Sequence, residues 1–165
     1  MKQQEKKYLI SSFTKIENKL ARIGAKKVKE VISVHYYGQH SGNDVEKFVE
    51  YADRVEAHVL KESGGQFTMI KHEEIPDKNS GLGWLRNQGY KTMNIVKMAY
   101  REYSYKNGTV GLYTIDDFLL SVILYYPSGQ HEAIEKEFGL ERAEVISVPY
   151  NKFLDQLGRL RSTNL

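Results

Sequence analysis

Three stretches of the chain carry apolar residues three or four positions apart, the spacing of a helix with one buried face. The first, residues 14–23, begins with Thr14 and Glu17 at the spacing of a capping box. The second includes Trp84 and Leu85. The third, HEAIEKEFGL at residues 131–140, has Ser128 as a candidate N-cap. Each stretch stops at a residue that readily adopts the left-handed conformation of a helix end, namely Gly24, Gly89 and Gly139. The pattern therefore predicts three helices that end in glycine.

Alternating apolar and polar residues predict strands in much of the remaining chain. Residues 98–116 alternate around Asn107 and Gly108, a dipeptide that favours a type I′ turn between antiparallel strands. A second hairpin is predicted around Gly64 and Gly65, because the residues before that pair also alternate. The chain thus combines helices with antiparallel strands.

Residues 44–62 allow two interpretations. A helix behind Asn43 or Asp44 would place apolar residues on one face, at Val45, Phe48, Val49, Ala52 and Val59. The alternation after Arg54 instead favours a strand. We expect a short helix or loop as far as Ala52, followed by the strand.

Turn-forming and apolar residues predict the structure of two further segments. Residues 76–83, PDKNSGLG, are rich in turn formers and are expected to link two halves of the protein, with a turn at Gly81 and Gly83. Pro149 starts a segment with a single apolar stripe, which predicts an amphipathic final helix. Residues 161–165 are expected to fray beyond it.

The sequence contains a weak internal repeat. Residues 20–34 align with residues 85–99, matching Gly24 with Gly89 and a lysine two positions after each glycine. The alignment indicates a duplicated helix-then-strand unit. An α+β fold built from two αβ halves is therefore expected.

Length and composition limit the class of protein. With 165 residues, the chain has the size of one domain, so we expect a single domain over residues 1–165. Its 41% hydrophobic and 27% charged residues are typical of a globular protein. No apolar run reaches the roughly 20 residues of a spanning helix, and the first residues lack the apolar core of a signal peptide. We expect a cytoplasmic protein without a membrane partner.

Charge and cysteine content narrow the possible chemistry. The absence of cysteine excludes disulfides, thiolate metal sites and cysteine nucleophiles, so any metal must bind to oxygen or imidazole. The five histidines show no close metal-ligand spacing, and His72 is interpreted as a solvated strand end that could reach a cavity. A net charge of +3, spread along the chain, does not predict nucleic-acid binding.

The first strand mixes charges on one face. In QQEKKYLI, alternation places Gln3, Glu5 and Lys7 together. Inside a barrel, such a carboxylate can hold a divalent cation while the neighbouring ammonium group holds phosphate oxygens. The alternative is a solvated, charged chain end that precedes the fold.

QQEKKYLI resembles the ExExK signature that opens CYTH domains, with Glu5 and Lys7 at the second glutamate and the lysine. This superfamily includes class IV adenylyl cyclases and thiamine triphosphatase-like enzymes. Later features follow in the family's order and cover nearly the whole chain, from the helix ending at Gly24 to the tyrosine-led segment after Pro149. The resemblance implies an antiparallel β-barrel, open at both ends, with helices packed outside.

The resemblance also implies the residues of a triphosphate site. The positions that grip phosphate in the family correspond to Lys7, Arg54, Lys71 and Lys97, with Arg101 a looser match. Lys7 and Arg54 are the candidate catalytic residues. Glu5 and Asp116 match positions that bind Mg²⁺ or Mn²⁺. Clustered cations shielded from water bind a polyanion strongly, and phosphoryl transfer depends on charge neutralisation and positioning.

Departures from the family pattern leave several functions open. Gln3 replaces a glutamate, Glu56 replaces the second arginine of an RxR pair, and residues 121–126, SVILYY, replace a strand with two glutamates. The protein is thus expected to be a metal-dependent triphosphate hydrolase or cyclase, or a non-catalytic binder of a nucleotide, polyphosphate or RNA 5′ end.

A third possibility is an interaction domain in which inward-facing apolar side chains fill the barrel. The candidates to fill it are Val122, Leu124 and Tyr126. The ligand of the first two hypotheses is a phosphorylated small molecule, and the sequence does not specify the oligomeric state.

Overall fold

The computed structural model describes residues 2–165, and within them eight antiparallel strands form a closed barrel. Around the barrel the strand order is β6-β2-β3-β4-β5-β1-β8-β7, and β7 pairs back onto β6. The strands are β1 Gln3–Ile10, β2 Lys26–Gly38, β3 Val45–Glu50, β4 Val55–Ser63, β5 Gln66–Ile75, β6 Thr92–Tyr105, β7 Gly108–Ile115 and β8 Leu119–Pro127. The expected α+β barrel is confirmed.

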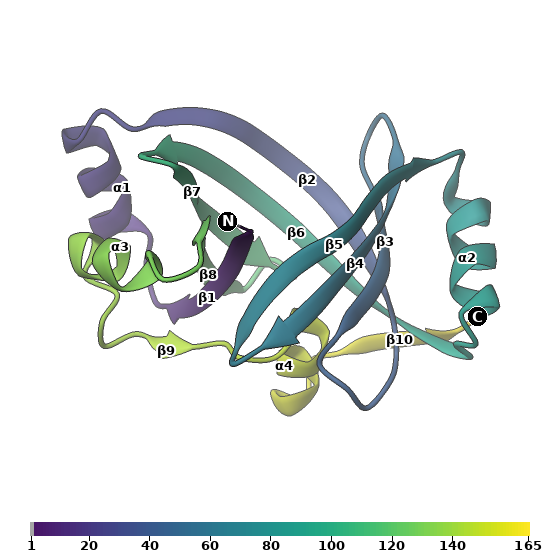
Figure 1. The fold of residues 1–165 in the computed structure, drawn as a ribbon. Coiled ribbons are helices and arrows are strands. Elements are labelled where there is room, and N and C mark those ends of the chain that lie inside the picture. Colours follow the sequence, from purple (N-terminus) through teal and green to yellow (C-terminus); the bar gives the residue numbers. More distant parts are fainter. Residues whose placement is uncertain (1) are drawn as a thin grey trace.

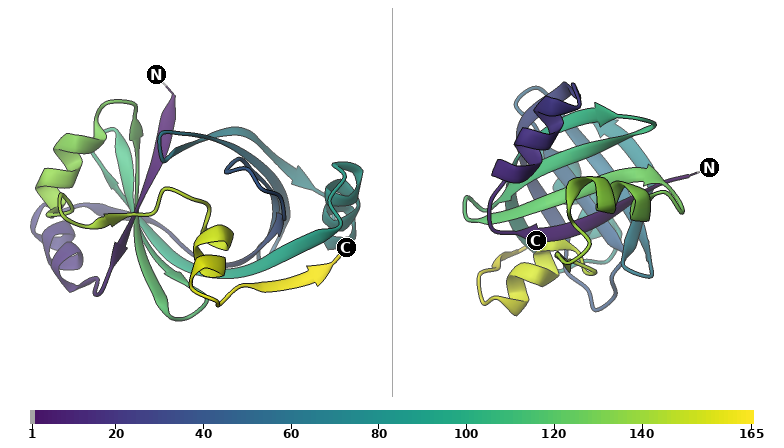
Figure 2. Two further views of the ribbon diagram at one scale, coloured as in Figure 1. Left: turned by 90° about the horizontal axis from the view of Figure 1, so that it is seen from below. Right: turned by 90° about the vertical axis from the view of Figure 1, so that its left-hand side faces the viewer.

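Four helices lie outside this barrel in the described part of the chain. They are α1 Thr14–Arg22, α2 Lys78–Asn87, α3 His131–Phe138 and α4 Tyr150–Gln156. Helices α1 and α3 lie together on one side, and α2 lies at the opposite end (Figures 1 and 2). No helix within residues 2–165 is long and apolar enough to cross a membrane.

The three glycine-ended helices are confirmed. The residues Gly24, Gly89 and Gly139 follow them with φ of 67°, 93° and 67°. The predicted caps are wrong, because Phe13 takes the N-cap position of α1 and Gln130 that of α3. Asp77 caps α2, where its side chain accepts a hydrogen bond from the Ser80 N–H.

Both predicted hairpins are present. Gly64 and Gly65 connect β4 to β5 with φ of 58° and 79°, as a type I′ turn requires. In the β6–β7 hairpin the turn lies one residue earlier than predicted, because Tyr105 pairs with Gly108. A Cβ on Gly108 would lie 2.3 Å from the Tyr125 carbonyl oxygen, so this glycine is required by close packing between strands.

Residues 45–50 form strand β3, so both the helix and the helix-or-loop interpretations of this segment are wrong. Strand β3 lies between β2 and β4 and is covered on both faces. Phe48 and Val49, on opposite faces, are both fully buried. A strand buried on both faces carries a continuous apolar run instead of a clear alternation, and such a run can imitate helical spacing.

Two expectations about loops are also wrong. Residues 76–83 are not a linker, because α2 begins at Lys78 and places Gly81 against the Phe48 ring, where a Cβ would lie 2.6 Å away. Residues 161–164 do not fray, because they form β10 Arg161–Asn164 and pair with the start of β6. The short β9 Glu144–Val145 pairs with β1.

The two predicted repeat units correspond to α1–β2 and α2–β6. Their strands pair with each other along nearly their whole length, from Lys26 opposite Ser104 to Gly38 opposite Met93. Strand β10 covers the part of β6 that β7 does not reach. This arrangement leaves β6 with hydrogen-bonded neighbours on both sides.

Large apolar side chains pack both inside the barrel and between the strands and the outer helices. Val122, Leu124 and Tyr126 belong to the cluster beneath α1 and α3. The expectation that they face inward and fill the barrel is therefore wrong, because side chains alternate along β8 and these three face the helices. Ile123 and Tyr125 face the interior instead.

Candidate functional site

The barrel encloses a cavity of about 400 Å³, which we call the barrel cavity and which is lined by charged, aromatic and apolar side chains. Its cationic lining residues are Lys7, Lys29, Lys47 and Arg54. Its acidic lining residues are Glu5, Glu56 and Glu102. Aromatic hydroxyl groups come from Tyr37, Tyr51, Tyr100, Tyr113, Tyr125 and Tyr150. The cavity thus offers several hydrogen-bond donors and a small excess of cations.

Lys7 is held in place by the barrel wall. Its Nζ atom donates a hydrogen bond to the Val148 carbonyl oxygen at 2.7 Å. The same ammonium group lies 4.0 Å from the centre of the Phe67 ring and 4.5 Å from that of Tyr150. These cation–π contacts help to stabilise a charge that is almost fully buried.

Lys47 is buried with fewer partners. Its Nζ atom donates one long hydrogen bond, 3.5 Å, to the Tyr37 hydroxyl group and lies 4.9 Å from the centre of that ring. Glu5 is the carboxylate that interacts electrostatically with both Lys47 and Lys7. Lys47 therefore has more unused hydrogen-bonding capacity than Lys7.

Burial shifts the pKa values of all three groups. Desolvation lowers the pKa of Lys7 to about 7 and that of Lys47 to about 8, although Glu5 opposes both shifts. Desolvation likewise raises the pKa of Glu5, and Lys47 and Lys7 partly offset this effect. A bound anion would favour the charged form of both lysines.

The free energy of unfolding should therefore increase with pH between about 7 and 9. In this range the unfolded chain, with lysine pKa values near 10.4, binds more protons than the folded protein, in which Lys7 and Lys47 lose theirs. We expect a gain on the order of 3 kcal/mol, measured by urea unfolding at pH values across this range. In a Lys7→Met/Lys47→Met variant this increase should be lost. An equal slope in both proteins would contradict the assignment.

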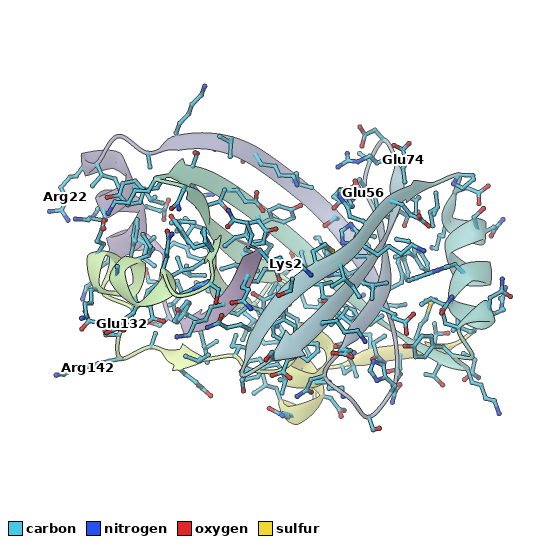
Figure 3. The ribbon with its side chains drawn as sticks, in the orientation of Figure 1. Lys2, Arg22, Glu56, Glu74, Glu132 and Arg142 are labelled. Atoms are coloured by element: carbon cyan, nitrogen blue, oxygen red, sulfur yellow. The ribbon has the colours of Figure 1, made fainter. Side chains whose placement is uncertain are left out.

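A second polar group lies where β4 begins, and we call it the rim cluster: Arg54, Glu56, His58 and His72. The Arg54 Nε donates to Glu56 Oε1 at 2.7 Å. Glu56 Oε2 accepts from the Nε2 atoms of His58 at 3.0 Å and His72 at 2.6 Å. Figure 3 shows Glu56 at this end of the barrel, close to Glu74, its partner across β4 and β5.

Burial and hydrogen bonds shift the pKa values of Glu56 and His58 in the rim cluster. Burial opposes ionisation of Glu56, but hydrogen bonds from His58, Arg54 and His72 outweigh it and lower the pKa to about 2. Burial and the Lys47 charge lower the pKa of His58 to about 4, against the effect of Glu56. Near pH 7, Glu56 is therefore ionised and His58 is neutral.

Of the site residues expected from the sequence, Glu5, Lys7 and Arg54 line the barrel cavity. The predicted common face of Gln3, Glu5 and Lys7 agrees with the alternation of β1. His72, interpreted as a solvated strand end, is exposed but also lines the cavity and bonds Glu56. Glu56, expected only as a departure from the family pattern, is the centre of the rim cluster.

Lys97 and Arg101 lie on the outer face of β6, away from the barrel cavity. Lys97 Nζ pairs with Asp117 at 3.1 Å, and Arg101 pairs with Glu17 at 3.3 Å. Because successive strand residues face opposite sides, the inward positions of β6 belong to its even-numbered residues. Those that line the cavity are Met98, Tyr100 and Glu102. The implied position of both cations inside the barrel is wrong.

Lys71 also faces outward, where it pairs with Glu73 at 3.2 Å. A β-bulge causes this orientation: Val59 pairs with Lys71 but Leu60 pairs with Met69, so Ile70 is an extra residue. Before the bulge the odd-numbered residues of β5, such as Met69, face the cavity, and after it the even-numbered residues do. As a result His72, not Lys71, enters the cavity.

Asp116 lies between β7 and β8, and it does not line the cavity with Glu5. Its Oδ1 atom accepts hydrogen bonds from the Lys97 N–H at 2.8 Å and from Arg161 at 2.9 Å. The two residues implied as Mg²⁺ or Mn²⁺ ligands therefore do not lie together. The Asp116 carboxylate already accepts hydrogen bonds from β6 and from β10. A hard dication needs several converging oxygen atoms, so these two residues do not fit it.

Comparison with known proteins identifies the fold. No family model and no curated protein matches the sequence. A protein from Pyrococcus horikoshii has a similar structure, with a TM-score of 0.76 and 16% identity over 90% of this chain and 96% of that one. A candidate adenylate cyclase from Vibrio parahaemolyticus matches with a TM-score of 0.70 and 14% identity, over 94% and 98% of the two chains.

A candidate adenylate cyclase from Bacillus halodurans matches with a TM-score of 0.61 and 11% identity, over 94% of this chain and 98% of that one. The structural similarity covers nearly the whole chain and extends to the closed antiparallel barrel. The two candidate adenylate cyclases share this fold, which agrees with the barrel that the resemblance to CYTH domains implies.

Proposed function

We propose that the barrel cavity binds a phosphorylated small molecule, with a triphosphate-containing compound as the best fit. The observation that carries this proposal is the pair of buried ammonium groups, Lys7 and Lys47, whose side chains face one enclosed space. Two buried cations beside a single carboxylate, Glu5, are poorly compensated in the free protein. An anion between them would supply the missing charge.

The rest of the lining supports the same class of ligand. Hydroxyl groups such as those of Tyr125 and Tyr51 can donate hydrogen bonds to phosphate oxygens, while the ring faces can contact an organic portion. Lys29 and Arg54 supply further positive charge to the lining. Electrostatic attraction is stronger here than in water because the walls exclude solvent.

The positions of the acidic residues favour binding of the ligand without turnover. Glu5 and Asp116 do not share the cavity, and Glu56 is engaged by Arg54 and two histidines. A nucleotide, polyphosphate or RNA 5′ end could then be held without hydrolysis. The chemistry of phosphoryl transfer would require charge neutralisation that these carboxylates do not arrange.

Metal-dependent hydrolysis or cyclisation is the second candidate. It is supported by the similarity of fold to two candidate adenylate cyclases and by Glu5 and Glu102, two carboxylates that line the cavity. In this case Mg²⁺ or Mn²⁺ would neutralise phosphate charge when bound, and Lys7 and Arg54 would hold the substrate. The second function would release a product from the bound triphosphate compound, whereas the first would not.

Calorimetric titration with inorganic triphosphate, in buffer containing EDTA, tests the proposal. We expect saturable one-to-one binding, with tighter binding of triphosphate than of orthophosphate because more charges meet the lysines. A rise in melting temperature with ligand concentration should accompany it. No binding of triphosphate or ATP would refute the proposal.

Turnover is measured separately, by incubating the protein with triphosphate, ATP or thiamine triphosphate and Mg²⁺ or Mn²⁺. Release of phosphate, pyrophosphate or a cyclic nucleotide above the level of a Lys7→Ala variant would establish the second candidate. Binding without product would favour the first.

A further inference from the structure

Glu56, His58 and His72 bring three metal-binding side chains to one point on the wall of the barrel cavity. Each offers one donor atom, and the three atoms lie within 4.8 Å of one another. The residues come from adjacent strands: His58 and His72 are direct partners across β4 and β5, and Glu56 is two residues before His58 on the same face. The pairing therefore fixes their convergence.

We propose that these three residues, the Glu–His–His group, bind a divalent first-row transition metal ion such as Mn²⁺, Fe²⁺, Co²⁺ or Zn²⁺. The site is separate from the Glu5 and Asp116 pair that the family resemblance implies.

The donor set determines the class of ion. Two imidazole nitrogens and one carboxylate suit transition metals, whereas Mg²⁺ and Ca²⁺ take oxygen ligands almost exclusively. With bonds of about 2.0–2.2 Å, ligand atoms around such an ion lie roughly 3 Å apart. The present separations of 3.0 Å and 2.6 Å between Glu56 Oε2 and the two Nε2 atoms are already close to this spacing.

The surroundings prepare the group for an ion. Arg54 Nε holds the other carboxylate oxygen of Glu56 at 2.7 Å, so Oε2 remains directed at the histidines. Partners of this kind orient metal ligands and strengthen binding. When a metal binds at the Nε2 atoms, each neutral ring changes tautomer and carries its single proton on Nδ1 instead of donating it from Nε2 to Glu56. Small side-chain movements are sufficient.

Three protein ligands leave coordination positions open. Glu56 and His58 are buried, while the side chain of His72 is 58% exposed, so an ion can enter from solvent. The group also lines the barrel cavity, so an open position can face a molecule bound there. Three protein ligands with free coordination positions are typical of catalytic metal sites, whereas in structural sites the protein fills all positions.

This inference does not depend on the proposed anion site. Neither Lys7 nor Lys47 belongs to the Glu–His–His group, although Lys47 lies directly opposite His58 where β3 pairs with β4. Metal binding can therefore be measured without phosphate, and triphosphate binding can be measured without metal. Failure of one proposal leaves the other intact.

Titration of the metal-free protein with Co²⁺ tests the site, because Co²⁺ bound to nitrogen and oxygen ligands acquires visible d–d absorption. We expect one equivalent to bind, Zn²⁺ to displace it and a large excess of Mg²⁺ to leave it in place. His72→Gln removes an exposed ligand with little risk to folding and should weaken binding at least about tenfold. Glu56→Gln should have a similar effect.

Matched controls are His40→Gln and Glu73→Gln. His40 lines a different, more open hollow, and Glu73 is adjacent to His72 but pairs with Lys71 on the outer face. Both controls should keep the absorption change and affinity of the unmodified protein. The proposal is overturned if Co²⁺ and Zn²⁺ do not bind, or if their binding survives unchanged in both His72→Gln and Glu56→Gln. In that case the cluster is a hydrogen-bonded network only.

Discussion

Replacing Lys47 by methionine is expected to weaken the binding of inorganic triphosphate on the order of 100-fold. Lys47 is nearly as buried as Lys7, but its ammonium group has only one long hydrogen bond, to Tyr37. Its donors are thus free to meet an anion. Charge-assisted hydrogen bonds are stronger than neutral ones, and here they form in an enclosed space.

The Lys47→Met variant should fold at least as well as the unmodified protein. Methionine has a similar length without a charge that must be desolvated, and Glu5 keeps Lys7 as a partner. A loss of affinity with an undiminished melting temperature would therefore identify a contact with the ligand. A loss of both would show that Lys47 supports the fold.

Lys71→Met is the matched control for this experiment. Lys71 carries the same charge but lies on the outer face of β5, paired with Glu73. Calorimetric titration in EDTA should give the same dissociation constant for this variant as for the unmodified protein. If the two substitutions weaken triphosphate binding equally, the ligand does not occupy the barrel cavity.

Replacing Phe48 by alanine should lower the free energy of unfolding by about 3–5 kcal/mol. Phe48 is completely buried between β3 and α2, stacks on Tyr36 with ring centres 4.6 Å apart, and touches Gly81. Alanine would leave a cavity beneath α2, since Gly81 has no side chain to fill it. Urea unfolding measures the difference.

Phe118→Ala provides the comparison for this measurement. Phe118 is 39% exposed and contacts Arg159 through its ring face, so we expect a loss of about 1 kcal/mol or less. Similar losses for the two variants would indicate that α2 is not held by this contact.

Local signals in the sequence were sufficient for the helix ends and the hairpins. Gly24, Gly89 and Gly139 each have the positive φ that a helix end requires, and Gly64 and Gly65 have the same property in a turn. These features depend on a few neighbouring residues. For that reason they can be predicted without knowing the fold.

Non-local packing decided what the sequence analysis missed. Strand β3 was not predicted because both of its faces are covered and its residues do not alternate clearly. For the same reason Lys47 was not identified as a cavity residue. The extra residue Ile70 in β5 brings His72 instead of Lys71 to the cavity wall, and the even-numbered residues of β6 face the cavity, so Lys97 and Arg101 face outward. Each depends on strand pairing, which a pattern of residue types does not specify.

The hydrogen bond between Arg54 and Glu56 has a consequence for selectivity. An anion that binds Arg54 alone must take the place of the Glu56 carboxylate, which leaves the number of paired charges unchanged. A guest with several charges can leave that pair intact and extend to Lys7 and Lys47 deeper inside. The affinity of the proposed site would therefore increase with the number of cations that a ligand contacts at once, and a polyanion would bind more tightly than chloride or acetate.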